Sequence, residues 1–150
     1  MRDASRRADR SERRGGLPNA LFVVAAAEAL PYELDGQACH LSVTLPWGSL
    51  LRGLLTADAG ILAGLHRICA PGAGVELLLS LTPRDGAGYG MVLDMASLSR
   101  LGASYERCGF DMVAMCPATA SDVAATHSTW AKRLGVGRER PAWRVGLVRR

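Results

Sequence analysis

Short continuous apolar runs recur along the chain and are separated by stretches of a different pattern. The first two are residues 20–25 and residues 41–45, and Pro46 ends the second. Further runs cover residues 75–81, 110–115 and 143–148. Continuous apolar runs of this length are typical of strands that are buried on both faces of a sheet. Proline cannot donate to a central ladder, so the second strand should end at residue 45. The pattern therefore predicts five strands.

The stretches between these runs indicate helices. Residues 3–14 are charged and alanine-rich, and two glycines follow as a stop. Leucines and isoleucines at helical spacing cover residues 50–68, with a break near Asp58. Two more helices are expected from Met95 to Cys108 and from Asp122 to Leu134, the latter capped by Ser121. Alternating strands and helices predict an α/β fold with a largely parallel sheet, whose last strand can run antiparallel.

Length and charge narrow the class of protein. A chain of 150 residues suffices for one domain with a core, and its formal net charge is +4. The basic residues gather at both ends, namely Arg2, Arg6, Arg7, Arg10, Arg13 and Arg14, and Lys132, Arg133, Arg138, Arg140, Arg144, Arg149 and Arg150. Two basic ends around an apolar body indicate a polyanionic partner, although two solvated basic ends have the same composition.

Several classes of protein find little support. The four cysteines are irregularly spaced within apolar runs, which favours reduced, buried thiols in a cytoplasmic protein and no metal site. Arginines before residues 21–27 resemble an export signal, but Pro18 and Asn19 precede the short run and Glu28 follows it. No run is long enough to cross a bilayer, so no membrane partner is expected. Residues 85–90 are glycine-rich but lack a full phosphate-loop motif, and we interpret them as a linker.

Two places carry candidate chemistry. In open α/β sheets, ligands bind beyond the carboxyl ends of the strands. Glu28 follows the first predicted strand, and the proline turn after the second exposes Trp47, with Gly48 and Ser49 next. The alternative for Trp47 is an aromatic cap on the core. The second place holds Ser128, Trp130, Lys132, Arg133, Arg138 and Arg140. Aromatic rings interleaved with arginines suit nucleic acid, although a solvated basic helix face has the same pattern.

Four segments together resemble a known family. They are residues 15–20, 22–31, 45–51, and 128–134 with 137–140, in the family's order. They resemble the Kam-type 16S rRNA adenine-N1 methyltransferases, which confer aminoglycoside resistance. The resemblance implies a class I (Rossmann-like) S-adenosylmethionine-dependent methyltransferase sheet. It also implies a cytoplasmic monomer that acts on a decoding-site adenine of 16S rRNA in the 30S ribosomal subunit.

The resemblance also assigns roles to individual residues. Trp47 and Trp130 are implied as the two walls that hold the target base. The implied cofactor-binding residues are Ala27, Glu28, Thr44, Leu45, Ser49 and Ser128. The implied RNA contacts are Lys132, Arg133, Arg138 and Arg140. No metal ligand is implied.

Members of this family open with a strand, a glycine-rich turn, a helix and a second strand that ends in an acid, and none of these has a counterpart here. We therefore expect the carboxyl-terminal part of such a sheet, lacking the first two strands, with residues 1–16 as a basic helix remnant and residues 17–150 as sheet and helices. This partial domain should bind cofactor weakly and have impaired activity. The alternative is a non-catalytic RNA-binding remnant of such an enzyme.

Overall fold

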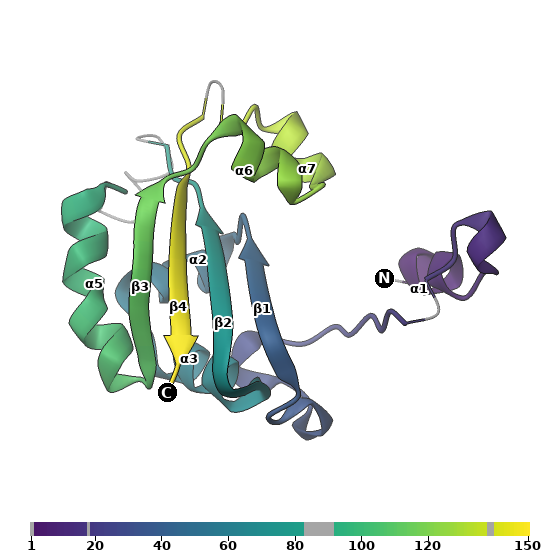
Figure 1. Cartoon of the computed structure of the whole chain (residues 1–150), viewed down its shortest axis with the longest axis horizontal. Helices are drawn as coiled ribbons and strands as arrows, with labels where there is room; N and C mark the ends of the chain where they lie inside the picture. Colours follow the sequence, from purple (N-terminus) through teal and green to yellow (C-terminus); the bar gives the residue numbers. More distant parts are fainter. Residues whose placement is uncertain (1, 18, 83–91, 138–139) are drawn as a thin grey trace.

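The computed structural model describes residues 2–17, 19–82, 92–137 and 140–150. Within them one mixed sheet has four strands in the order β1-β2-β4-β3 (Figure 1). These are β1 (Ala38–Thr44), β2 (Cys69–Leu79), β3 (Phe110–Pro117) and β4 (Trp143–Arg149). β1 is parallel to β2, and β4 is antiparallel to both β2 and β3. The predicted α/β fold and the antiparallel last strand are confirmed.

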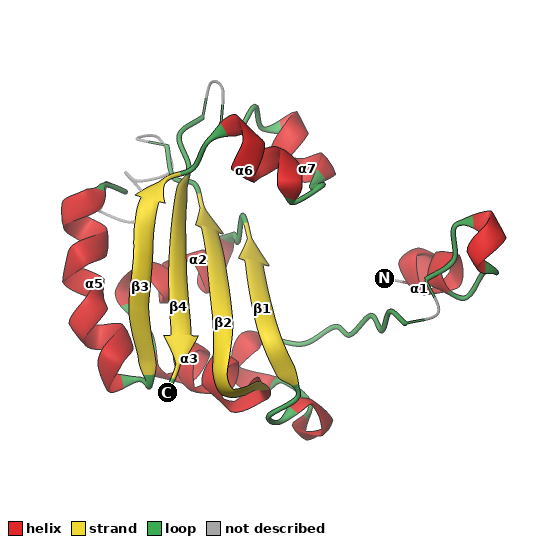
Figure 2. Ribbon diagram, in the orientation of Figure 1, coloured by secondary structure: helices red, strands yellow, loops and turns green. Residues whose placement is uncertain are grey.

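Three helices cover one face of this sheet (Figure 2): α2 (Gly48–Thr56), α3 (Ala59–Ile68) and α5 (Met95–Arg107). Their apolar sides meet alternate strand residues in the main core, where Leu54, Leu62, Leu98 and Phe110 are fully buried. Tyr105 of α5 is also buried and donates its hydroxyl to the Leu54 carbonyl at 2.8 Å. This satisfies a polar group that burial would otherwise make costly.

Two short helices lie where β1 and β2 end (Figure 1): α6 (Ala120–Ala125) and α7 (Thr129–Arg133). They form a second, smaller cluster with that end of the sheet, and its buried members are Leu45, Leu78, Val123, Ala131, Val136 and Ala142. The prediction of one helix from Asp122 to Leu134 was wrong, because the backbone turns at His127, whose φ is 51°. The predicted cap was also wrong: Thr119, not Ser121, caps α6, in a reciprocal pair with Asp122.

The first predicted strand, residues 20–25, is not a strand. The segment is irregular and solvent-exposed, with Leu21 82% and Val24 78% exposed. Figure 1 shows it as part of an arm that leads to α1 (Arg2–Ala8). A buried strand requires neighbours on its ladder, and the only strand paired with β1 in the described part of the chain is β2.

Other boundaries also differ from the prediction. The helix expected over residues 3–14 is α1 followed by a 3₁₀ turn, η1 (Glu12–Arg14), which ends at Gly15. β2 starts at Cys69, earlier than the predicted run, which begins at residue 75. Two further 3₁₀ turns, η2 (Ala27–Ala29) and η3 (Tyr32–Leu34), precede β1. The glycine-rich segment 85–90 lies outside the described residues.

The described residues hold neither a membrane-spanning helix nor a cluster of metal ligands. No single helix there has the length and apolar composition to span a bilayer, and only α2 and α3 taken together, bent by 96°, have both. No group of three or more His, Cys, Asp or Glu side chains in the described ranges could hold a metal ion. The four cysteines are free, and Cys39 is exposed, contrary to the expectation that all are buried.

Candidate functional site

The carboxyl end of β1 turns sharply and presents Trp47 to solvent. Leu45 has a φ of 49°, and its amide donates to the Leu78 carbonyl of β2 at 2.8 Å. Leu45 itself is buried in the second cluster, so the chain must turn outward immediately after it. Trp47 then occupies the N-cap position of α2 with 46% of its surface exposed. The interpretation of Trp47 as a core-capping aromatic is therefore disfavoured.

Trp130 is presented beside the same cluster by α7. Ser128 caps this helix, because its side chain accepts a hydrogen bond from the Ala131 amide at 3.2 Å. Ala131 is buried in the second cluster, and Trp130, the residue before it, is 45% exposed. Both tryptophans thus flank one apolar cluster at one end of the sheet, and neither is buried. Among the described residues their rings make no direct contact with each other.

Arg140 joins this end of the sheet to Trp47. Its guanidinium carbon lies 5.7 Å from the centre of the Trp47 ring, within the range of a cation–π interaction. Its Nε donates to the hydroxyl of Ser80 at 2.8 Å. Ser80 is buried and had no role in the sequence prediction, because a lone serine within a largely apolar run carries no signal. Its importance comes entirely from the tertiary contact.

The other predicted RNA-binding residues lie at the end of α7. Lys132 and Arg133 are exposed in its last turn, where cations also complement the helix dipole. They line a groove of about 640 Å³ between α6 and α7. Arg138 lies outside the described residues. The structure thus brings Trp130, Lys132 and Arg133 together on one helix, close to the cluster beside Trp47.

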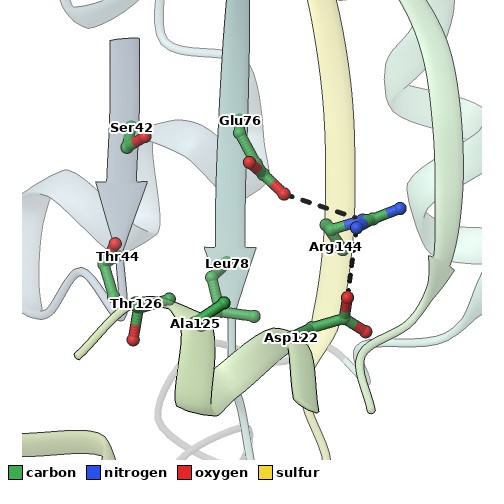
Figure 3. Close-up of a pocket in the computed structure, with 8 residues that line it drawn as sticks. All are labelled: Ser42, Thr44, Glu76, Leu78, Asp122, Ala125, Thr126 and Arg144. Atoms are coloured by element: carbon green, nitrogen blue, oxygen red, sulfur yellow. Dashed lines mark hydrogen bonds and ion pairs between the residues drawn. The ribbon is translucent and has the colours of Figure 1, made fainter. Parts of the chain in front are cut away.

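A second hollow, of about 420 Å³, opens on the face of the sheet opposite α2 and α3 (Figure 3). It is lined by Ser42, Thr44, Glu76, Leu78, Asp122, Ala125, Thr126 and Arg144. Arg144 forms ion pairs across it, at 3.1 Å with Asp122 and at 3.6 Å with Glu76. Hydrogen bonds from Thr119, and then the charge of Arg144, lower the pKa of Asp122. Thr44 is the only predicted cofactor residue that lines this hollow.

The remaining predicted cofactor residues do not gather at one point. Ser49 is exposed in the first turn of α2. Ala27 and Glu28 belong to η2, which packs on α3, so they lie on the opposite side of the sheet from Thr44. The contact is close, since a Cβ atom at Gly64 would lie 1.8 Å from the Ala27 carbonyl oxygen. In the described residues, then, Ala27 and Glu28 lie on the opposite side of the sheet from Thr44.

Comparisons with known proteins agree on one family. The model of the 16S rRNA (adenine(1408)-N(1))-methyltransferase family, NpmA, matches residues 1–148. The enzyme of that name from Streptoalloteichus hindustanus is 34% identical over 146 residues, which are 93% of this chain and 66% of that protein. The crystal structure of the 16S rRNA methyltransferase KamB aligns with a TM-score of 0.85 and 30% identity, over 99% of this chain and 71% of KamB.

A further crystal structure includes a cosubstrate. It is that of a tryptophan-to-alanine mutant of the 16S rRNA (adenine(1408)-N(1))-methyltransferase from Catenulisporales acidiphilia, with cosubstrate SAM. It aligns with a TM-score of 0.77 and 27% identity, over 99% of this chain and 70% of that one.

These likenesses define the class as that of the S-adenosylmethionine-dependent methyltransferases. The chain belongs to the family of 16S rRNA (adenine(1408)-N(1))-methyltransferases, and the resemblance deduced from the sequence is confirmed. The chain spans about two thirds of the length of the curated relative from S. hindustanus.

Proposed function

We propose that this chain serves the S-adenosylmethionine-dependent methylation of adenine N1 in 16S rRNA, and thereby aminoglycoside resistance. One observation carries the proposal: two half-exposed tryptophans, with an arginine over one of them, flank one cluster at the carboxyl end of the sheet. Ligands of open α/β sheets bind at this end. Half-exposed indoles are suited to stacking on a base, at about 1–3 kcal/mol per stack.

In this proposal Trp47 and Trp130 hold the target adenine. The N1 atom of a paired adenine is buried in the duplex, so the base has to be unpaired or extruded before it can react. Neutral adenine already carries a lone pair on N1, which removes the need for a strong general base. The two indoles therefore act by positioning the ring rather than by moving a proton.

The proposed cofactor residues offer suitable chemistry but an incomplete arrangement. The hydroxyls of Thr44, Ser49 and Ser128 and the Glu28 carboxylate match the polar groups of S-adenosylmethionine, while Ala27 and Leu45 offer apolar contact. S-adenosylmethionine would supply an activated methyl group on a sulfonium. Because Glu28 lies on the α3 side of the sheet and Thr44 on the other, we expect the isolated chain to bind this cofactor weakly. Titration calorimetry on residues 1–150 tests this, and tight binding would contradict it.

The proposed partner is 16S rRNA in the 30S subunit, in the cytoplasm. Lys132, Arg133, Arg138 and Arg140 would hold phosphates of a folded RNA surface that is recognised largely by shape. The chain would act as a monomer, as a partial methyltransferase domain formed by residues 1–150. A second candidate function, RNA binding without catalysis, is favoured by the separation of Ala27 and Glu28 from Thr44 across the sheet.

The test uses purified 30S subunits and S-adenosylmethionine labelled in its methyl group. Because the chain should bind the cofactor weakly, we expect only partial labelling of a decoding-site adenine, detected as a primer-extension stop, and its loss in Trp47→Ala and Trp130→Ala. The matched control is Trp143→Phe, because Trp143 packs against the main core. Binding of 30S subunits that depends on both tryptophans, without methyl transfer, would favour the second candidate. Binding and methylation unaffected by both alanine variants would refute the site.

A further inference from the structure

A buried hydroxyl joins two elements behind Trp47. Ser80 directly follows the last residue of β2 and is only 5% exposed. Its Oγ donates to the Pro141 carbonyl at 2.7 Å and accepts from the Arg140 Nε at 2.8 Å. A serine hydroxyl has a single proton, so the bond to Pro141 leaves its lone pairs facing the arginine. Ser80 therefore holds two successive residues of the α7–β4 connection.

The backbone of Arg140 is held as well. Its amide donates to the Gly135 carbonyl at 3.2 Å, and its carbonyl accepts from the Gly137 amide at 2.9 Å. With the backbone fixed and the Nε bonded to Ser80, the plane of the guanidinium has little freedom. The guanidinium carbon lies over the Trp47 ring, 5.7 Å from its centre. The loop that carries Trp47 is itself tied to β2 through Leu45 and Leu78.

We propose that Ser80 is a positioning residue for Trp47 and acts through Arg140. By fixing the guanidinium, it fixes the indole in the orientation that stacks on an adenine base. This inference rests on the proposed function, since it takes Trp47 as one wall of the base site. An indole ring that is already ordered before the base binds loses no rotational freedom on binding. A guanidinium, which donates from Nε to Ser80 while its carbon lies over the ring, suits this task in a way that an ammonium does not.

Fluorine NMR of the whole chain labelled with 5-fluorotryptophan tests the proposal without RNA. The chain has three tryptophans, so three resonances are expected, and Trp47→Phe assigns the one of interest. Ser80→Ala should shift and broaden the Trp47 resonance, and Arg140→Ala should shift it in the same way. The double variant should add nothing further, because both changes release the same contact. Ser80→Thr, which keeps the hydroxyl, should restore the original resonance.

Two controls separate positioning from a loss of fold. Ser99→Ala removes a serine hydroxyl that bonds to the Met95 carbonyl on the exposed side of α5, and it should shift none of the three resonances. Should Ser80→Ala fail to fold, Arg140→Lys replaces it, because it keeps the charge, lacks the Nε donor and lies outside the core. An unchanged Trp47 resonance in the folded variants, or a larger shift in the double variant than in Arg140→Ala, would overturn the proposal.

A second measurement links the ring to RNA. Binding of a fluorescein-labelled RNA hairpin that contains the decoding-site adenine should weaken about two- to fivefold in both Ser80→Ala and Arg140→Lys, the range expected for losing one cation–π contact. If Trp47→Ala leaves binding of the hairpin unchanged, the proposed function is contradicted. The NMR result then still decides the role of Ser80. Weaker binding in Ser80→Ala without a shift of the Trp47 resonance would refute action through the ring.

Discussion

The C-terminal strand is joined to α3 through one histidine. The Nε2 atom of His66 accepts a hydrogen bond from the Arg149 Nε at 3.3 Å, and its ring meets Phe110 edge to face with centroids 5.5 Å apart. Accepting this bond requires an unprotonated Nε2. Burial first, and then the charge of Arg149, lower the pKa of His66 below its ordinary value of 6.5.

This arrangement predicts a pH dependence of stability. Near and below pH 6.5 the unfolded chain takes up a proton at His66 more readily than the folded chain. The contribution of neutral His66 to the free energy of unfolding is therefore complete above pH 6.5. It is lost as the pH falls from there toward the lowered pKa. Urea midpoints measured from pH 7.5 down to about pH 5.5 should decline in the native chain and less in His66→Gln. The exposed His127, replaced by Asn, is the control, and an equal decline in His66→Gln would contradict the prediction.

A buried phenol gives a second prediction at this scale. Burial raises the pKa of Tyr105, and its hydroxyl donates to the Leu54 carbonyl at 2.8 Å. Tyr105→Phe removes that bond from the main core and should lower the free energy of unfolding by about 1 kcal/mol. Tyr32→Phe, at a side chain that is 77% exposed, should leave the urea midpoint unchanged. Equal effects of the two changes would show that the hydroxyl of Tyr105 contributes nothing.

Among the elements, η2 and α3 show how a small residue sets a contact. A Cβ atom at Gly64 would lie 1.8 Å from the backbone oxygen of Ala27, so Gly64→Ala must displace η2. We expect it to destabilise the fold by about 1–3 kcal/mol. Gly102, in the middle of α5, has nothing within 4 Å of such an atom, and Gly102→Ala should stabilise by up to about 1 kcal/mol. Thermal unfolding measures both variants: the midpoint should fall in Gly64→Ala and rise in Gly102→Ala. Shifts of the same sign would contradict this prediction.

The elements also show how far a sequence predicts a fold. Strands with partners in the sheet could be predicted from their apolar runs, as β1, β3 and β4 were. Residues 20–25 have the same pattern, but pattern does not reveal whether a neighbouring strand is present. The break between α6 and α7 was missed because it depends on the left-handed backbone of His127. The sequence could locate Trp47 at a strand end and Trp130 on a helix, whereas the contacts of Ser80 and the Arg144 ion pairs arise only from tertiary structure.

At the scale of the whole molecule, two groups can be distinguished among the described basic residues of the C-terminal part. Arg150 is paired with Asp111 and Glu106, both at 2.6 Å, and Arg144 is paired with Asp122 and Glu76. Lys132 and Arg133 lie exposed on α7 next to Trp130. Net charge alone does not distinguish these groups. An arginine that is already paired with carboxylates is less available to bind a phosphate. The end of the sheet with the tryptophans is therefore the end expected to face RNA.

This division predicts the salt dependence of RNA binding. Each phosphate contact that is lost should reduce the slope of log K against log salt concentration by about 0.7–0.9. Lys132→Ala and Arg133→Ala should each reduce the slope by that amount, whereas Arg150→Ala should leave it unchanged. Titrations of the same RNA hairpin at several salt concentrations give this slope for each of the three variants. Since each variant removes one positive charge, a general effect of net charge would change the three slopes equally. Reduced slopes in the two α7 variants with an unchanged slope in Arg150→Ala would locate the contact on α7, whereas equal slopes, or a reduction in Arg150→Ala alone, would refute an RNA-binding end at the tryptophans.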